Sequence, residues 1–210
     1  AYAVKEACRD MAMPTTSSWE KVRRVVRYLK GEPRVVYEYN WQNHEDISVY
    51  VDTDWAGCFK TRKSTSGGAI IRGGHLLKHW SSTQQTIALS SGEAELKGIV
   101  NGAADGLGIQ NIGRDLDIHY DIHVYTDASA AMGMVARKGI GRVRHIEVSE
   151  LWIQDAVKIK VLTVNKVRGE DNPADILTKY IDQGKIHQHC HGMRLVPEIG
   201  RPESAPATSM

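Results

Sequence analysis

The 210-residue sequence has little of several residue types, and each shortage excludes a class of protein. Its three cysteines, Cys8, Cys58 and Cys190, show no paired spacing, which argues against a disulfide framework and fits a reducing compartment. No apolar run approaches the roughly 18 residues of a membrane span, so we expect no membrane partner. The formal net charge of +2 is nearly neutral, and it permits a nucleic-acid partner without requiring one.

The beginning of the chain lacks both an initiating methionine and a signal-peptide pattern, so we expect a fragment of a longer polypeptide. Its length suffices for one sizeable domain with appendages. The stretch after about Val196 is rich in proline, serine and alanine and is predicted to be disordered.

A helix is predicted over residues 17–30, where Ser17 and Glu20 form a capping-box pattern. Gly31 and Pro33 end it. Its apolar residues recur at helical spacing: Trp19, Val22, Val26 and Leu29. Residues 34–39 suggest a short strand, and the polar segment 40–46 marks a domain boundary.

Beyond this boundary, the hydrophobic pattern predicts a mixed α/β layer. The order is three strands, helix, strand, helix, helix, strand, helix. The strands are expected at 47–55, at 64–82 (two strands joined at Gly73-Gly74), at 121–127 and at 158–167. The helices are expected from Ser90 to about Gly108 with a stripe of Leu96, Val100, Ala103 and Leu107, at 128–139, at 145–157 and from Asn172-Pro173.

Four carboxylates fall near the ends of these elements. Asp52 lies late in its strand on the polar face, and Glu95 lies in the first turns of the long helix. Asp127 ends a strand, and Asp175 lies in the first turn of the helix opened at Asn172. Hard cations such as Mg²⁺ take oxygen ligands, and two of them can clamp a phosphodiester. Acids converging in this way would form a two-metal site.

Each acid also has a structural interpretation. Asp127 could cap the helix that follows, and Asp175 could complement a helix dipole. Asp52 could be an exposed strand residue, although aspartate is depleted in strands. The spacing alone does not separate these alternatives.

The pair Glu93 and Glu95 is easier to divide. Ser90 and Glu93 fit the capping pattern S-x-x-E. Glu95 points in a different direction because it lies two residues further along the helix. It has no such local task, and we therefore interpret Glu95 as a ligand.

Several motifs resemble the ribonuclease H region of copia-type LTR-retrotransposon polyproteins. They are D-x-D-W-A-G (52–57), R-K-S-T-S-G (62–67), W-S-S-x-Q-Q (80–85), A-L-S-S-x-E-A-E (88–95), VYTDASAAM (124–132), RHIEV (144–148) and A-D-I-L-T-K (174–179). The resemblance covers roughly residues 47–182 in consistent order. Residues 19–31 resemble the stretch that closes the reverse transcriptase in the same polyproteins.

This resemblance implies an α/β ribonuclease H-like fold, a five-stranded mixed sheet with its first three strands antiparallel, flanked by helices. It divides the chain into the end of the reverse transcriptase (1–45), a ribonuclease H-like domain (46–182), and a terminal helix with a disordered tail (183–210). It further implies hydrolysis of the RNA strand of RNA–DNA hybrids with two Mg²⁺, for which Mn²⁺ can substitute. The matching catalytic and metal-binding residues are Asp52, Glu95, Asp127 and Asp175, with Asp54 as the alternative to Asp52.

The resemblance also implies partners. Ser90 and Ser91 match polar substrate contacts of the family. Arg62 and Lys63 could meet phosphates of the hybrid or lie in a solvated turn. The nearly neutral charge predicts weak hybrid binding, with the remaining affinity supplied by the reverse transcriptase domain of the same polyprotein. The expected location is intracellular, in a cytoplasmic virus-like particle or the nucleus.

One departure from many cellular ribonucleases H concerns the loop before the last aspartate. It contains Gly169-Glu170-Asp171-Asn172 and no histidine. Glu170 or a water could replace that histidine, or turnover could be slower. Two rival functions remain: a catalytically silent nucleic-acid-binding module, and a ribonuclease H-fold nuclease that cuts DNA, such as an integrase or a resolvase.

Overall fold

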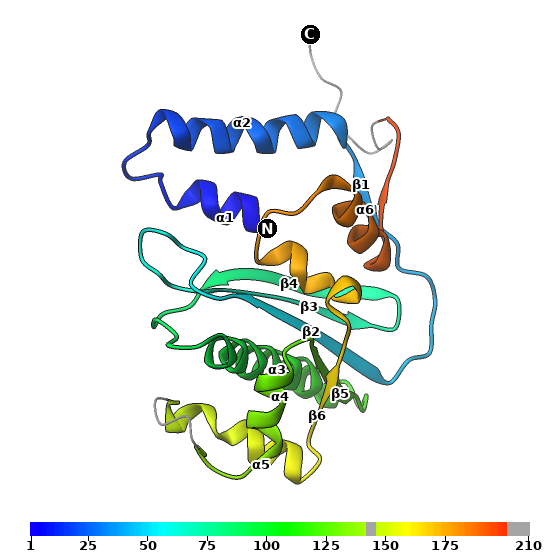
Figure 1. The fold of residues 1–210 in the computed structure, drawn as a ribbon. Helices are drawn as coiled ribbons and strands as arrows, with labels where there is room; N and C mark the ends of the chain where they lie inside the picture. Colours follow the sequence, from blue (N-terminus) through cyan, green and yellow to red (C-terminus); the bar gives the residue numbers. More distant parts are fainter. Residues whose placement is uncertain (142–145, 201–210) are drawn as a thin grey trace.

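The computed structural model describes residues 1–141 and 146–200. A five-stranded mixed sheet with the order β4-β3-β2-β5-β6 forms its centre, and helices lie on both faces (Figure 1). β2, β3 and β4 are antiparallel, whereas β5 and β6 run parallel to β2. The bounds are Asp46–Asp54 for β2, Thr65–Arg72 for β3, His75–Thr83 for β4, Asp121–Thr126 for β5 and Thr163–Lys166 for β6. The predicted five-stranded mixed sheet, with its first three strands antiparallel and helices on both faces, is confirmed.

The alternation of β2 explains how the sheet acquires its core. Ile47, Val49 and Val51 are fully buried and pack in the main hydrophobic cluster, to which α3 contributes Leu96 and Ile99. Helix α3 spans Ser91–Asp115 and therefore runs beyond the expected end near Gly108. Below it in Figure 1 lie α4 (Ser129–Ala136) and α5 (Trp152–Lys158).

Glycines, more than the predicted apolar stripe, let α3 lie close to the sheet. A Cβ atom on Gly102 would lie 2.5 Å from Val51 Cγ1, and one on Gly98 would lie 2.7 Å from Thr53 Oγ1. A Cβ atom does not approach another heavy atom this closely, so α3 can lie at this distance from the sheet only because these two positions lack side chains. Of the predicted stripe, Leu96 and Ala103 are buried, whereas Val100 and Leu107 are half-buried.

The opposite face is covered by segments from both ends of the chain. Helices α1 (Tyr2–Cys8), α2 (Thr16–Gly31) and α6 (Gln183–Gly192) lie above the sheet in Figure 1, with the 3₁₀ helix η3 (Pro173–Leu177) next to β2 and β3. β1 (Val35–Tyr37) pairs antiparallel with β7 (Leu195–Pro197), so part of the expected tail is a strand. The helix expected at 145–157 is divided into η1 (Val148–Glu150) and α5. Position 145 and the tail 201–210, which carries the rest of the predicted disorder, lie outside the described residues.

Helix α2 differs from its prediction in two ways. Its N-cap is Thr15, which forms a capping box with Ser18, so the pattern at Ser17 and Glu20 is not the cap. Its apolar stripe also faces outward: Trp19 is 58% exposed, Val26 57% and Leu29 55%. The helical spacing of apolar residues therefore identified the helix correctly but not a buried face.

Within the part of the chain that the structure describes, no helix combines the length and the apolar character that a membrane crossing requires.

Candidate metal centre

Two aspartates lie at the same level of the sheet, Asp52 near the C-terminal end of β2 and Asp127 directly after β5. Tyr50 of β2 lies opposite Tyr125 of β5 as the last pair of their register, and the two rings stack with centroids 5.0 Å apart. Two residues beyond this pair, the chain reaches Asp52 on one side and Asp127 on the other. The register thus brings both aspartates to the C-terminal ends of adjacent strands, where open α/β sheets commonly bind ligands.

A third acid reaches the same point from the helix layer. Glu95 lies one turn into α3, which the contacts at Gly98 and Gly102 hold against β2. One carboxylate oxygen from each of Asp52, Glu95 and Asp127 lies within 4.8 Å of the other two. Three residues that are distant in sequence therefore present oxygen ligands to one small volume.

The electrostatics of Glu95 are those of a carboxylate crowded by others. Burial, followed by the charges of Asp52 and Asp127, raises the pKa of Glu95 to about 9, although a backbone hydrogen bond from Thr53 acts in the opposite direction. Its Oε2 atom is buried and has no hydrogen-bond partner among the described residues. A buried acceptor of this kind is costly unless a partner satisfies it, and a cation would be such a partner.

Asp52 is held by a neighbouring hydroxyl group. Thr178 Oγ1 donates a hydrogen bond to Asp52 Oδ2, and both residues are buried. Burial raises the pKa of Asp52, and the hydrogen bond from Thr178 and the charge of Lys179 partly counteract it. Thr178 therefore fixes one oxygen of the carboxylate in place.

Asp175 lies beside this cluster but is not one of the three acids that meet there. Its carboxylate pairs with the ammonium group of Lys179, and its charge acts on the pKa of Asp52. Asn172 positions η3 as predicted: its side chain accepts from Ala174 N–H at 3.1 Å, and it also donates to Val51 O at 2.9 Å. Asp175 is thus held near β2, and its carboxylate is paired with the ammonium group of Lys179.

The capping alternative for Asp127 does not describe the structure. The N-cap of α4 is Ala128, with no side-chain cap. The backbone oxygen of Asp127 accepts a hydrogen bond from Lys166 Nζ at 2.9 Å, which ties the end of β5 to β6. A Cβ atom on Gly169 would lie 3.0 Å from Asp127 Oδ2, so the loop after β6 closes directly over this carboxylate.

The division of labour between the two glutamates follows from their contacts. Ser90 caps α3 by accepting from Glu93 N–H at 3.2 Å. Glu93 turns back to accept from Leu89 N–H at 2.8 Å and pairs with Lys97 at 2.8 Å. Glu93 thus stabilises the start of the helix, as predicted, although its backbone partner is the residue before the cap. Ser91 is exposed beside it.

The other expected site residues lie outside the three-acid group. Arg62 and Lys63 belong to the turn between β2 and β3, where Arg62 is exposed and Lys63 half-buried. Asp54, the alternative first ligand, packs against Gly57, whose added Cβ would lie 1.8 Å from Asp54 Oδ2. Asp52 is the acid of this strand that joins the three-acid group. Glu170, in the loop without histidine, is exposed and pairs with Arg168 at 3.5 Å.

Thr178 and Lys179 were not singled out by the sequence reasoning. Both lie within the A-D-I-L-T-K motif, three and four residues after Asp175. This spacing returns side chains to the same side of a helical turn, and that is the signal that could have identified them.

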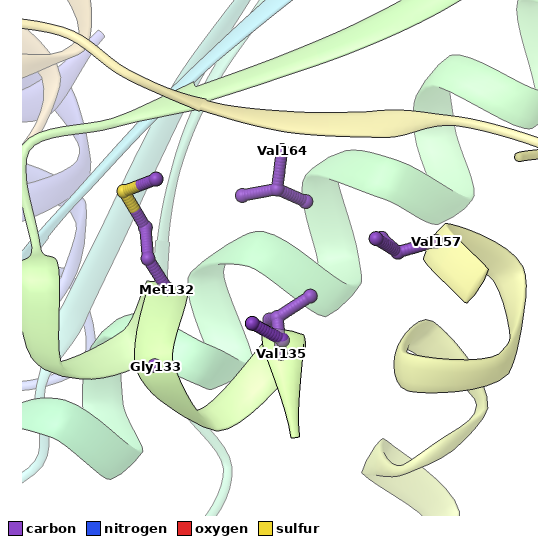
Figure 2. Close-up of a pocket in the computed structure, with 6 residues that line it drawn as sticks. Met132, Gly133, Val135, Val157 and Val164 are labelled. Carbon is purple, nitrogen blue, oxygen red and sulfur yellow. The ribbon is translucent and has the colours of Figure 1, made fainter. Parts of the chain in front are cut away.

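A cavity of about 270 Å³ lies between α4, α5 and β6 and includes none of these acids (Figure 2). It is lined by Met132, Gly133, Val135, Ala136, Val157 and Val164. None of these side chains carries a charge or a strong hydrogen-bonding group, whereas ligand sites usually add a few convergent polar groups to apolar walls. We interpret the cavity as a gap in packing between the helix pair and the edge of the sheet.

No family model matches the sequence. The chain is 29% identical over 188 residues to the retrovirus-related Pol polyprotein from transposon TNT 1-94 of Nicotiana tabacum, covering 89% of this chain and 14% of that protein. It is 31% identical over 182 residues to the corresponding polyprotein from transposon RE2 of Arabidopsis thaliana, covering 85% of this chain and 12% of that protein. The chain therefore spans a small part of these relatives.

Among solved structures, ribonuclease H1 of the archaeon Halobacterium salinarum NRC-1 is similar, with a TM-score of 0.46 and 12% sequence identity. The similarity covers 63% of this chain and 94% of that one.

Proposed function

We propose, from the similarity of the chain to retrovirus-related Pol polyproteins of copia-type transposons, that it is the ribonuclease H part of such a polyprotein. It would cut the RNA strand of RNA–DNA hybrids with the help of divalent metal ions. The observation that carries the proposal is the convergence of Asp52, Glu95 and Asp127 at the ends of β2 and β5 and the start of α3.

The donor set fits Mg²⁺, with Mn²⁺ as a substitute. All three groups offer carboxylate oxygens, which these hard cations prefer, and the unpaired Oε2 of Glu95 lacks the partner that a cation would supply. Asp175 would be the fourth ligand, recruited from its position beside Asp52. When bound, two such ions would lower the pKa of a water molecule and neutralise charge on the attacking and leaving oxygens of the phosphodiester.

Neighbouring residues of the chain would hold the carboxylates in position for the metal ions. Thr178 orients Asp52, and Lys166 fixes the backbone at Asp127. Glu95 keeps its proton in the metal-free protein and releases it when a cation replaces that proton. The acids are thus held in position by contacts that need no metal.

Substrate recognition would rest on hydroxyl groups and a few cations. Ser91 is exposed at the start of α3, one residue from the cap and four from Glu95, where it could contact the sugar–phosphate backbone. Ser90 is occupied as a cap, so its contact with a substrate would have to share that oxygen. Arg62 and Lys63 would meet phosphates, and a 2′-OH of the scissile strand would distinguish RNA from DNA.

The reverse transcriptase of the same polyprotein would be the partner. The outward-facing stripe of α2 (Trp19, Val22, Val26 and Leu29) supports this, because an exposed apolar row on an amphipathic helix is a common contact surface. We keep the division into 1–45, 46–182 and 183–210 as a proposal. The first and last parts pair through β1 and β7, so they would form one small unit beside the nuclease.

A cleavage assay tests the proposal. The purified chain should cut a labelled RNA–DNA hybrid in the presence of Mg²⁺ or Mn²⁺ and leave duplex DNA intact. Asp127→Asn should abolish cutting, because an amide of the same shape binds Mg²⁺ poorly. The unfolding free energy of this variant should stay close to that of wild type, since Asp127 caps no helix. Asp105→Asn makes the same chemical change at a surface carboxylate that pairs with Lys78 at 2.8 Å, and it serves as the matched control.

Two other outcomes would refute the proposal in different ways. Hybrid binding without any cleavage by the folded chain would favour a silent nucleic-acid-binding module. Cleavage of duplex DNA in preference to the hybrid would favour a DNA nuclease of the same fold.

A further inference from the structure

Lys179 is a positive side chain at the edge of the acid cluster. Of the described residues, Lys179 is the cation whose charge acts to lower the pKa of both Asp52 and Glu95. Its ammonium group pairs with Asp175. The ammonium group of Lys166, another lysine nearby, donates hydrogen bonds to the backbone oxygen of Asp127 and to the hydroxyl of Ser129. Lys179 is therefore placed to neutralise several acids.

The side chain of Lys179 can move although its backbone is held in place. Its neighbour Thr178 is buried and bonded to Asp52, so the backbone is anchored at this point. The side chain of Lys179 is 47% exposed, whereas that of Asp175 is 16% exposed. A lysine has a flexible stem of four carbons and a compact ammonium group, so its head can leave the acid for water while the backbone remains fixed.

We propose that Lys179 is a tethered counter-ion, which holds Asp175 when no metal is bound and is displaced when a divalent cation enters. This inference deepens the proposed ribonuclease H function and rests on it. In the metal-free protein, the ammonium group takes the place of a cation next to closely spaced carboxylates. A divalent ion competes with it, and its departure frees Asp175 as the fourth ligand.

The charge of Lys179 determines whether its removal raises or lowers the metal affinity of the site. A positive group beside the site repels an incoming Mg²⁺ or Mn²⁺, so removing it should increase metal affinity. Lys179→Met keeps an unbranched apolar side chain that is one atom shorter and removes the charge, whereas Lys179→Arg keeps the charge. The matched control is Lys78→Met, which removes a lysine that pairs with Asp105 at 2.8 Å on the surface, with similar exposure of 46%.

Calorimetric titration of the purified full chain with Mn²⁺, without substrate, is the main experiment. We expect Lys179→Met to bind Mn²⁺ more tightly, on the order of tenfold, which corresponds to about 1.4 kcal/mol. Lys179→Arg and Lys78→Met should bind as wild type does. If folded Lys179→Met binds Mn²⁺ as tightly as wild type or more weakly, the counter-ion role is refuted. If wild type binds Mn²⁺ and Asp127→Asn does not, the proposed metal centre is supported whatever the result for Lys179.

A second measurement uses the wild-type chain and does not depend on how the variant folds. Acetylation of individual lysines, followed by mass spectrometry, reports whether each ammonium group is engaged. We expect added Mg²⁺ to increase labelling of Lys179 by several-fold and to leave Lys78 unchanged. Equal labelling of Lys179 with and without Mg²⁺, in a chain shown to bind the metal, would refute displacement. If wild type binds no metal at all, the proposed function itself fails.

Discussion

The replacement Glu95→Gln should make the metal-free protein more stable at neutral pH. This outcome is unusual for a residue placed at the centre of a site, and its reason is electrostatic. Glu95 has a pKa of about 9 in the folded protein, against an ordinary value of 4.5. Between these two values the unfolded chain has lost the proton and the folded chain has kept it, so folding takes up a proton.

The magnitude follows from proton linkage. The free energy of unfolding falls by about 1.4 kcal/mol for each pH unit in this window. The contribution of Glu95 to stability is fully present below its pKa in the unfolded chain, 4.5, and is lost as the pH rises towards its pKa in the folded protein, about 9. Wild type should therefore lose about 3 kcal/mol between about pH 5 and about pH 7 through Glu95 alone. Glutamine has a similar shape and does not titrate, so the variant lacks this loss.

Urea denaturation with a chelator, over a series of pH values, measures the effect. The stability difference between Glu95→Gln and wild type should grow with pH and reach about 3 kcal/mol near neutrality. Added Mg²⁺ should stabilise wild type, which can bind it, and leave the variant unchanged. The control Glu93→Gln weakens the hydrogen bond to Leu89 N–H and the ion pair with Lys97, and should lose about 1–3 kcal/mol.

Two results would refute this reasoning. One is a Glu95→Gln variant that is less stable than wild type at neutral pH in chelator. The other is a stability difference that does not depend on pH, since it would mean that the carboxylate is not kept protonated by its surroundings.

Other substitutions test the contacts that support the centre. Gly102→Ala should destabilise the chain by about 1–3 kcal/mol in urea, because the added methyl meets Val51 at 2.5 Å; a gain in stability would mean that α3 can shift freely. Thr178→Val should cost about 1–3 kcal/mol by removing the hydrogen bond to the buried carboxylate of Asp52, and it should weaken Mn²⁺ binding in calorimetry. If Thr178→Val binds Mn²⁺ as tightly as wild type, the hydrogen bond from Thr178 is not needed to orient Asp52 for metal binding.

Local signals in the sequence were sufficient for the elements that carry the acids. The hairpin of β3 and β4 was predictable because Gly73, with φ of +56°, supports a tight turn between two apolar runs. Asn172 was predictable as a cap because it precedes a proline at the first position of a helical turn. Glu93 was identifiable as the capping acid by its distance from Ser90, which left Glu95 for the centre.

Features that depend on contacts between distant segments were not predictable in this way. The stripe of α2 has helical spacing whether it faces the core or solvent, so its exposure required the structure. Strand β7 exists through pairing with β1, about 160 residues earlier in the chain. The spacing of Asp175 and Lys179 is compatible with their ion pair but does not establish it, because a lysine four residues after an acid is common on any helical surface.

Crystals soaked in Mn²⁺ offer the most direct test of the central claim, because anomalous scattering locates this ion independently of the protein atoms. We predict anomalous density between the carboxylates of Asp52, Glu95 and Asp127, with Asp175 turned towards it and away from Lys179. Density elsewhere on the chain, or none in a soak that saturates binding in solution, would contradict the account.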